Sequence, residues 1–124
     1  MDLHQRQQFD FLLHTATERF VMRLEERHRG PEPALAALRA DPAAAGLPDF
    51  VTAIFQDFLL DNADGAAFVL RCLPRRSVAS HRAAIDAAGT VEEMLLLLAK
   101  SLFAELLLAK ATEALEQHVG YQAV

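Results

Sequence analysis

Cysteine is almost missing from this chain, which has Cys72 alone among its 124 residues. One cysteine cannot form an intramolecular disulfide and supplies too few thiolates for a zinc or iron–sulfur site. We therefore expect no metal, no cofactor and a reducing, cytoplasmic location. Cys72 lies in the apolar segment FVLRCL, where a free cysteine usually packs as a small hydrophobe, although nearby arginines would lower the pKa of an exposed thiol.

Uninterrupted apolar runs are also lacking. The most apolar stretch, residues 94–111, is broken by Lys100, Ser101, Glu105 and Lys110, whereas a membrane-spanning helix needs about 20 nearly continuous apolar residues. The first residues, MDLHQRQQFDFLLH, show neither the basic start nor the apolar centre of a signal peptide. We expect no membrane partner and no secretion by that route.

Positive charge is scarce, because 12 Lys and Arg residues face 17 Asp and Glu residues, a formal net charge of −5. An acidic chain is not attracted to phosphate backbones or anionic lipids. Residues 77–98 could be read as a helix-turn-helix, but the second helix begins VEEM, so two glutamates would face the phosphates. We do not expect nucleic-acid binding. Lysine is rarer than arginine and alanine is abundant, a bias typical of GC-rich bacterial genomes.

Helical patterning is what the chain has in abundance. Its 124 residues, 52% hydrophobic and 23% charged, suit one domain with a buried core. Apolar residues recur at helical spacing, and no segment alternates like a strand. The prediction is an all-α single domain over 1–124, a bundle of about five to six helices with a long apolar C-terminal helix. The predicted helices span 3–29, 33–40, 50–61, 65–73, 78–88 and 91–118.

Local signals mark several helix ends. Gly30-Pro31 should end the first helix, and Asp49 and Asp64 are the predicted N-caps of the helices that follow them. Thr90-Val-Glu-Glu93 has the form of a capping box and should start the last helix. In the 50–61 helix a broad stripe should face the core, formed by Phe50, Val51, Ile54, Phe55, Phe58 and Leu59.

The last helix presents two apolar faces. One continuous row, predicted to be core, consists of Val91, Leu95, Leu98, Leu102 and Leu106. A second row lies roughly 140° away and consists of Leu97, Ala104, Leu108 and Leu115. Either this helix runs through the middle of the bundle, or the second row meets another chain. We favour a homodimer that uses the second row, because an apolar stripe can pair with its own copy.

A smaller anomaly lies on the 3–29 helix. Phe11 and Met22 point nearly opposite to its core stripe and share a line with His4. They are further interface candidates, although single apolar side chains on a surface are common.

The sequence contains no complete catalytic or metal-binding motif. Helical di-iron sites need two Glu-x-x-His units, and only Glu25-x-x-His28 is present; His14 and Glu18 lie too far along the helix to join it. Residues 60–71 resemble a calcium loop but have Leu60 and Arg71 where oxygen ligands belong. No nucleophile lies beside a base in any recognisable motif. We predict no catalytic residues and no metal site.

One basic cluster stands out in the acidic chain and consists of Arg71, Arg75, Arg76 and Arg82. It is a candidate site for an anion or an acidic partner, and the plainer interpretation is that it pairs with Asp61, Asp64 or Asp86.

The leading hypothesis is a non-enzymatic protein-binding module, a small regulator, assembly chaperone, or antitoxin- or immunity-type partner, acting as a homodimer that binds another protein. The alternative is a bundle that binds a small apolar or anionic ligand, with aromatic helices walling the cavity and the arginine cluster at its mouth. A DNA-binding regulator ranks below both.

Overall fold

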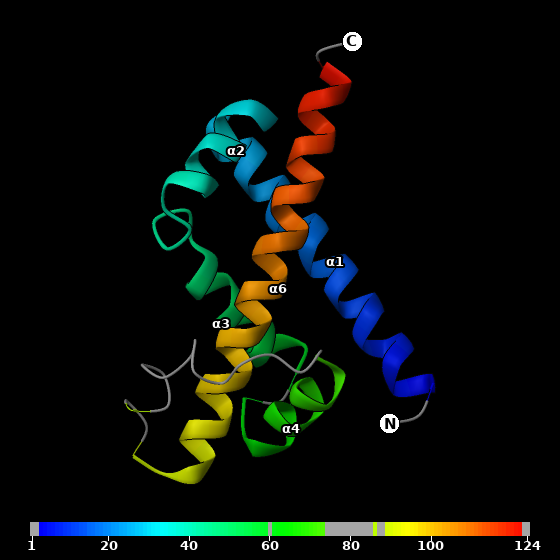
Figure 1. Ribbon diagram of the computed structural model, residues 1–124, viewed down its shortest axis with the longest axis vertical. Coiled ribbons are helices and arrows are strands. Elements are labelled where there is room, and N and C mark those ends of the chain that lie inside the picture. The colour runs from blue at the N-terminus through cyan, green and yellow to red at the C-terminus, as the bar shows by residue number, and fades with distance from the viewer. Residues whose placement is uncertain (1–2, 60, 74–85, 87–88, 123–124) are drawn as a thin grey trace.

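The chain is an all-α bundle with a long C-terminal helix, as predicted (Figure 1). The structure is a computed structural model and describes residues 3–59, 61–73, 86 and 89–122. Within those residues the helices are α1 (Leu3–His28), α2 (Pro31–Ala40), α3 (Leu47–Asp57), α4 (Ala63–Cys72) and α6 (Val91–Gln122). The helix predicted at 78–88 lies outside the described residues, apart from position 86.

The turn between α1 and α2 is set by two residues with positive φ. Arg29 has φ 60° and Gly30 has φ 138°, a region in which glycine is unstrained. The Gly30 amide donates to the Glu25 carbonyl at 2.9 Å and closes α1 within one residue of the predicted end. Because Pro31 takes the first helical position, where its missing N–H costs nothing, α2 begins two residues earlier than predicted.

The predicted caps of α3 and α4 are wrong. Gly46, with φ 92°, precedes α3, and Asp49 lies inside the first turn. Asn62 caps α4, because its side-chain oxygen accepts from the amides of Asp64 at 2.9 Å and Gly65 at 3.3 Å. Both helices therefore begin earlier than predicted, and each aspartate instead lies near the positive end of the helix dipole.

The Thr90 half of the predicted capping box at the start of α6 is confirmed, whereas the Glu93 side chain binds the amide of Gly89, one residue before Thr90. The Glu93 amide donates to Thr90 Oγ1 at 3.1 Å, and Glu93 Oε2 accepts from the Gly89 amide at 2.8 Å. These bonds satisfy two donors at the helix start and fix its direction. The helix then runs for 32 residues, about 48 Å at 1.5 Å per residue.

The central position of α6 decides where the core lies. It packs against α1, α2, α3 and α4, with α4 beside its N-terminal half and α2 beside its C-terminal half (Figure 1). Its fully buried residues recur every fourth position: Ala99, Phe103, Leu107, Ala111 and Leu115. A four-residue spacing drifts about 40° per step, so the buried line winds around α6 as its neighbours change.

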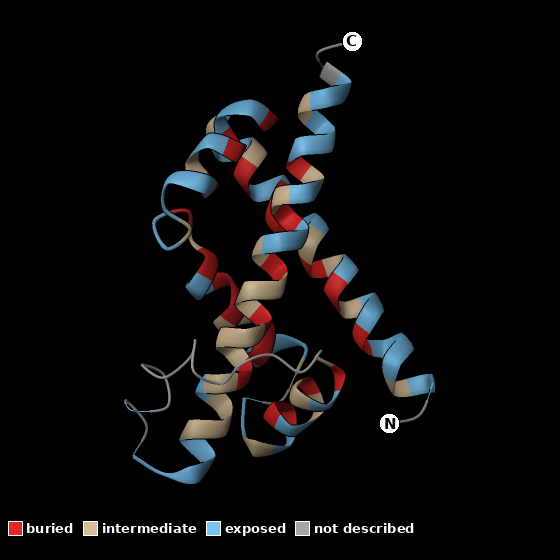
Figure 2. Ribbon diagram, in the orientation of Figure 1, coloured by how far each residue is buried: buried red, intermediate tan, exposed pale blue. Residues whose placement is uncertain are grey.

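The predicted core row of α6 is wrong as a result. Val91 is 69% exposed, and the other four members are only half-buried. The last turns of α6 are mostly exposed and extend past α2 (Figure 2). None of the helices in the described part of the chain is long and apolar enough to cross a membrane.

Aromatic rings fill the centre of the bundle. Phe103 of α6 meets Phe9 edge-to-face at 6.2 Å between ring centres and Phe55 at 6.0 Å. Phe20 packs on Phe50 at 5.1 Å. Of the predicted stripe on α3, Phe50, Val51, Ile54 and Phe55 are core. Phe58 and Leu59 follow the helix end: Phe58 is 52% exposed, with Arg19 over its ring, and Leu59 is partly buried. Phe9 also lines a groove between α1 and α6, and Phe20 and Phe50 line a smaller one of about 290 Å³.

Candidate interaction groove between α1 and α6

A groove of about 920 Å³ lies between α1 and α6, with Cys72 of α4 at its edge. Its apolar lining comes from both helices, namely Phe9, Leu13, Val21 and Met22 of α1 and Leu106 and Ala114 of α6. Most of these side chains belong to the core or pack against it. Phe9, Leu13 and Val21 are almost completely buried, so the apolar surface that the groove exposes comes mainly from Met22, Leu106 and Ala114.

Polar and charged side chains also line the groove. The charged groups and histidines among them are Arg6, Asp10, His14 and Glu18 on α1, and Lys110, Glu113 and His118 on α6. Arg6 Nε lies 3.4 Å from Asp10 Oδ1, and His14 Nε2 lies 3.0 Å from Glu18 Oε1, each pair one helical turn apart. Such exposed pairs contribute little to stability, typically under about 1 kcal/mol. They give the groove an apolar interior and a polar rim.

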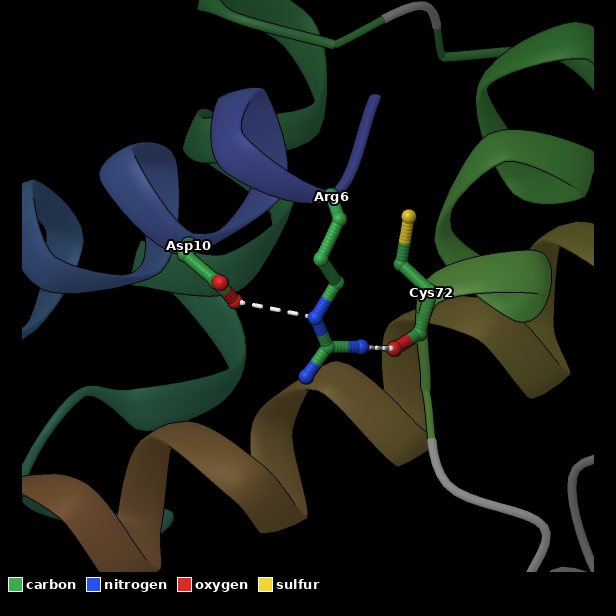
Figure 3. Close-up of polar contacts among 3 residues, drawn as sticks. All are labelled: Arg6, Asp10 and Cys72. Carbon is green, nitrogen blue, oxygen red and sulfur yellow. Dashed lines mark hydrogen bonds and ion pairs between the residues drawn. The ribbon is translucent and has the colours of Figure 1, made fainter. Parts of the chain in front are cut away.

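Arg6 joins α1 to α4 at one end of the groove. Its Nη1 donates to the carbonyl of Cys72 at 2.6 Å, and Figure 3 shows the guanidinium between that carbonyl and the Asp10 carboxylate. Cys72 is the last residue of α4, so Arg6 satisfies one of the orphan carbonyls and opposes the negative end of the helix dipole. The sequence carried no signal for this contact, because 66 positions separate the partners.

The thiol of Cys72 is not activated. Its side chain is buried, with 2% of the residue exposed. Burial raises the pKa of the Cys72 thiol, and the nearby Arg6 and Arg71 only partly oppose this effect. The thiol is therefore protonated and shielded at neutral pH, which favours the small-hydrophobe interpretation of Cys72.

The other end of the groove is held by His118 of α6 and Glu25 of α1, whose side chains contact each other through Nδ1 and Oε1. Glu25 thus binds a distant histidine and does not form a ligand pair with His28. In the described ranges, no group of three or more His, Cys, Asp or Glu residues could hold a metal ion.

The predicted interface residues fall into two sets. Phe11 is 73% exposed and Met22 is 59% exposed, as expected for candidates on the outer side of α1, and Met22 also lines the groove. The second apolar row of α6, predicted as the dimer interface, is different. Leu115 is completely buried and Leu108 packs against the core. The prediction that Leu115 lies on an interface is wrong, because it is a core residue. Ala104 is half-buried in the same way, and only Leu97, at 36%, is exposed.

The arginine cluster is not assembled by the described residues. Arg71 is exposed on α4, whereas Arg75, Arg76 and Arg82 lie outside the part of the chain that the structure describes. Asp61, one of the predicted partners of the cluster, pairs with Lys100 Nζ at 2.8 Å.

Comparison with known proteins gives no match to a protein-family model, to a curated protein or to a solved structure.

Proposed function

We propose that this chain is a non-enzymatic helical protein-binding module that receives a helix of another polypeptide in the α1–α6 groove. It would act as a small regulator, assembly chaperone, or antitoxin- or immunity-type partner. The observation that supports this most is the groove itself, with apolar side chains inside and charged side chains along the rim.

A helix suits this groove for physical reasons. An amphipathic helix places apolar residues at i, i+3, i+4 and i+7 along one face, which can lie against an apolar groove while its polar flanks meet a charged rim. Burying the exposed part of Met22 and the half-exposed Leu106 would contribute about 25 cal/mol per Å² of apolar surface. Exposed apolar area of this kind is otherwise a cost to a folded chain.

The chemistry of the groove supports binding over catalysis. Its nucleophile candidate, Cys72, has a raised thiol pKa and a buried side chain, whereas catalytic cysteines need a lowered pKa and access. His14 contacts Glu18 on the solvent-exposed side of α1, and the hydroxyl of Thr17, which also lines the groove, donates to the Leu13 carbonyl at 2.7 Å.

A small apolar or anionic ligand is the second candidate. The volume of about 920 Å³ falls within the usual range of ligand sites, roughly 300–1,000 Å³, and Lys110 at the rim would attract an anion. This ligand would occupy the α1–α6 groove and not the aromatic core.

Photo-crosslinking distinguishes these occupants. A benzophenone amino acid replaces Ala114, inside the groove, and in a matched control it replaces Ala36, which is exposed on α2 and away from the groove. After irradiation of native cells, the proposal predicts polypeptide adducts at position 114 and few at position 36. Adducts with a small molecule would support the second candidate. Equal labelling at both positions would contradict a specific site.

A further inference from the structure

The outer side of α1 carries a row of residues that would match a second copy of the same row running in the opposite direction. Phe11, His14, Thr15, Glu18 and Met22 follow the spacing i, i+3, i+4, i+7 and i+11, so they share one face of the helix. Phe11 and Met22, at its ends, are 73% and 59% exposed. The side chains of His14 and Glu18, between them, are 72% and 64% exposed. We call this row the outer stripe of α1.

The symmetry of the outer stripe is the central observation. Eleven residues turn a helix by three turns and about 20°, and rise about 16 Å, so Phe11 and Met22 mark two apolar points on one side. If a second α1 runs antiparallel about the midpoint between Ala16 and Thr17, each Phe11 lies opposite a Met22. Each His14 then lies within one residue of the other copy's Glu18, an opposite-charge or hydrogen-bonded pair.

We propose that the occupant of this surface is a second copy of the chain, with the two α1 helices antiparallel and related by a two-fold axis. This inference rests on the proposed function and names its partner helix as the α1 of a second copy, since His14, Glu18 and Met22 also belong to the α1 wall of the groove. A two-fold interface requires one surface to be complementary to itself, and the outer stripe meets that condition in apolar and in charged groups.

The groove supplies the rest of the contact. A stable interface buries about 800 Å² on each partner, more than one phenylalanine and one methionine can provide. Antiparallel pairing about this midpoint overlaps residues 5–28 of both copies, nearly the whole of α1. The second α1 therefore lies along the groove mouth and also meets the α6 side of the rim, where Lys110 and Glu113 stand.

Disulfide trapping tests the geometry. Two chains of different tag length, both carrying Cys72→Ala, are mixed; one carries Phe11→Cys and the other Met22→Cys. Both positions are exposed, so the fold should persist. A disulfide needs Cα atoms within about 7 Å, whereas two copies of position 11 would be about 16 Å apart along the axis. The expected result is fast formation of the mixed 11–22 disulfide, with little of either homodimeric disulfide.

The control for random collision is Ala36→Cys, placed on exposed α2 in the same background. Homodimeric 11–11 and 22–22 disulfides would show a parallel pairing and overturn the inference. Mixed disulfides no faster than those of the Ala36→Cys control would overturn it as well. In either case, adducts of a different polypeptide at position 114 would leave the proposed function standing.

Discussion

At the residue scale, Phe103 joins three helices in the core. It is completely buried and meets both Phe9 and Phe55 edge-to-face. Replacing Phe103 with alanine leaves a cavity between three helices and should lower the free energy of unfolding by about 3–5 kcal/mol. Leu97→Ala is the control on the same helix, and because Leu97 is 36% exposed it should cost far less. Urea denaturation followed by circular dichroism measures both, and equal losses would contradict the assigned core.

Cys72 gives a pH prediction with a definite sign. Burial raises the pKa of its thiol in the folded chain, so the unfolded chain loses this proton first as the pH rises. The stability that this group contributes is complete below the unfolded thiol pKa and is lost as the pH rises from there through the folded pKa.

Urea denaturation at several pH values below and above the ordinary thiol pKa tests this sign. The wild type should lose more stability over that range than Cys72→Ala, which cannot ionise at this position. Parallel pH profiles for the two proteins would show that the thiol is not desolvated.

At the element scale, the start of α6 rests on the Thr90 and Glu93 capping box. Thr90→Ala removes the acceptor for the Glu93 amide and should cost about 1 kcal/mol, with faster amide exchange in the first turn. Thr90→Ser keeps the hydroxyl and should restore most of both. If Thr90→Ala exchanges as slowly as Thr90→Ser, the cap does not hold the helix end.

Sequence patterns predicted the positions of the helices better than they predicted which face of each helix is exposed. Glycine, proline and capping-box signals placed the end of α1 and the start of α6, because these depend on residues close in the chain. The start of α4 was missed since Asn62 and Asp64 are both good caps, and only the geometry shows which oxygen meets the amides. On α6, leucines lie on almost every side, so periodicity could not identify the buried line through Phe103 and Leu107.

At the scale of the whole molecule, the contacts that build the groove join distant positions. Arg6 and Cys72 are 66 positions apart in the sequence, and Glu25 and His118 are 93 positions apart. Local sequence patterns cannot predict such pairs. The exposure of Phe11 and Met22 was predictable, because their phase on α1 is opposite to a clear core stripe. The surface proposed for the dimer thus moves from α6, which is central to the bundle, to α1.

The most direct test of this account is the mass of the protein in solution, measured by light scattering over a concentration series. The wild type should approach twice the chain mass of 13.7 kDa. Met22→Glu should give a folded monomer, because it places a charge opposite Phe11, and Ala36→Glu on α2 should leave the dimer intact. A wild type that stays at 13.7 kDa at every concentration, or a Met22→Glu variant that still dimerises, would contradict the proposed pairing.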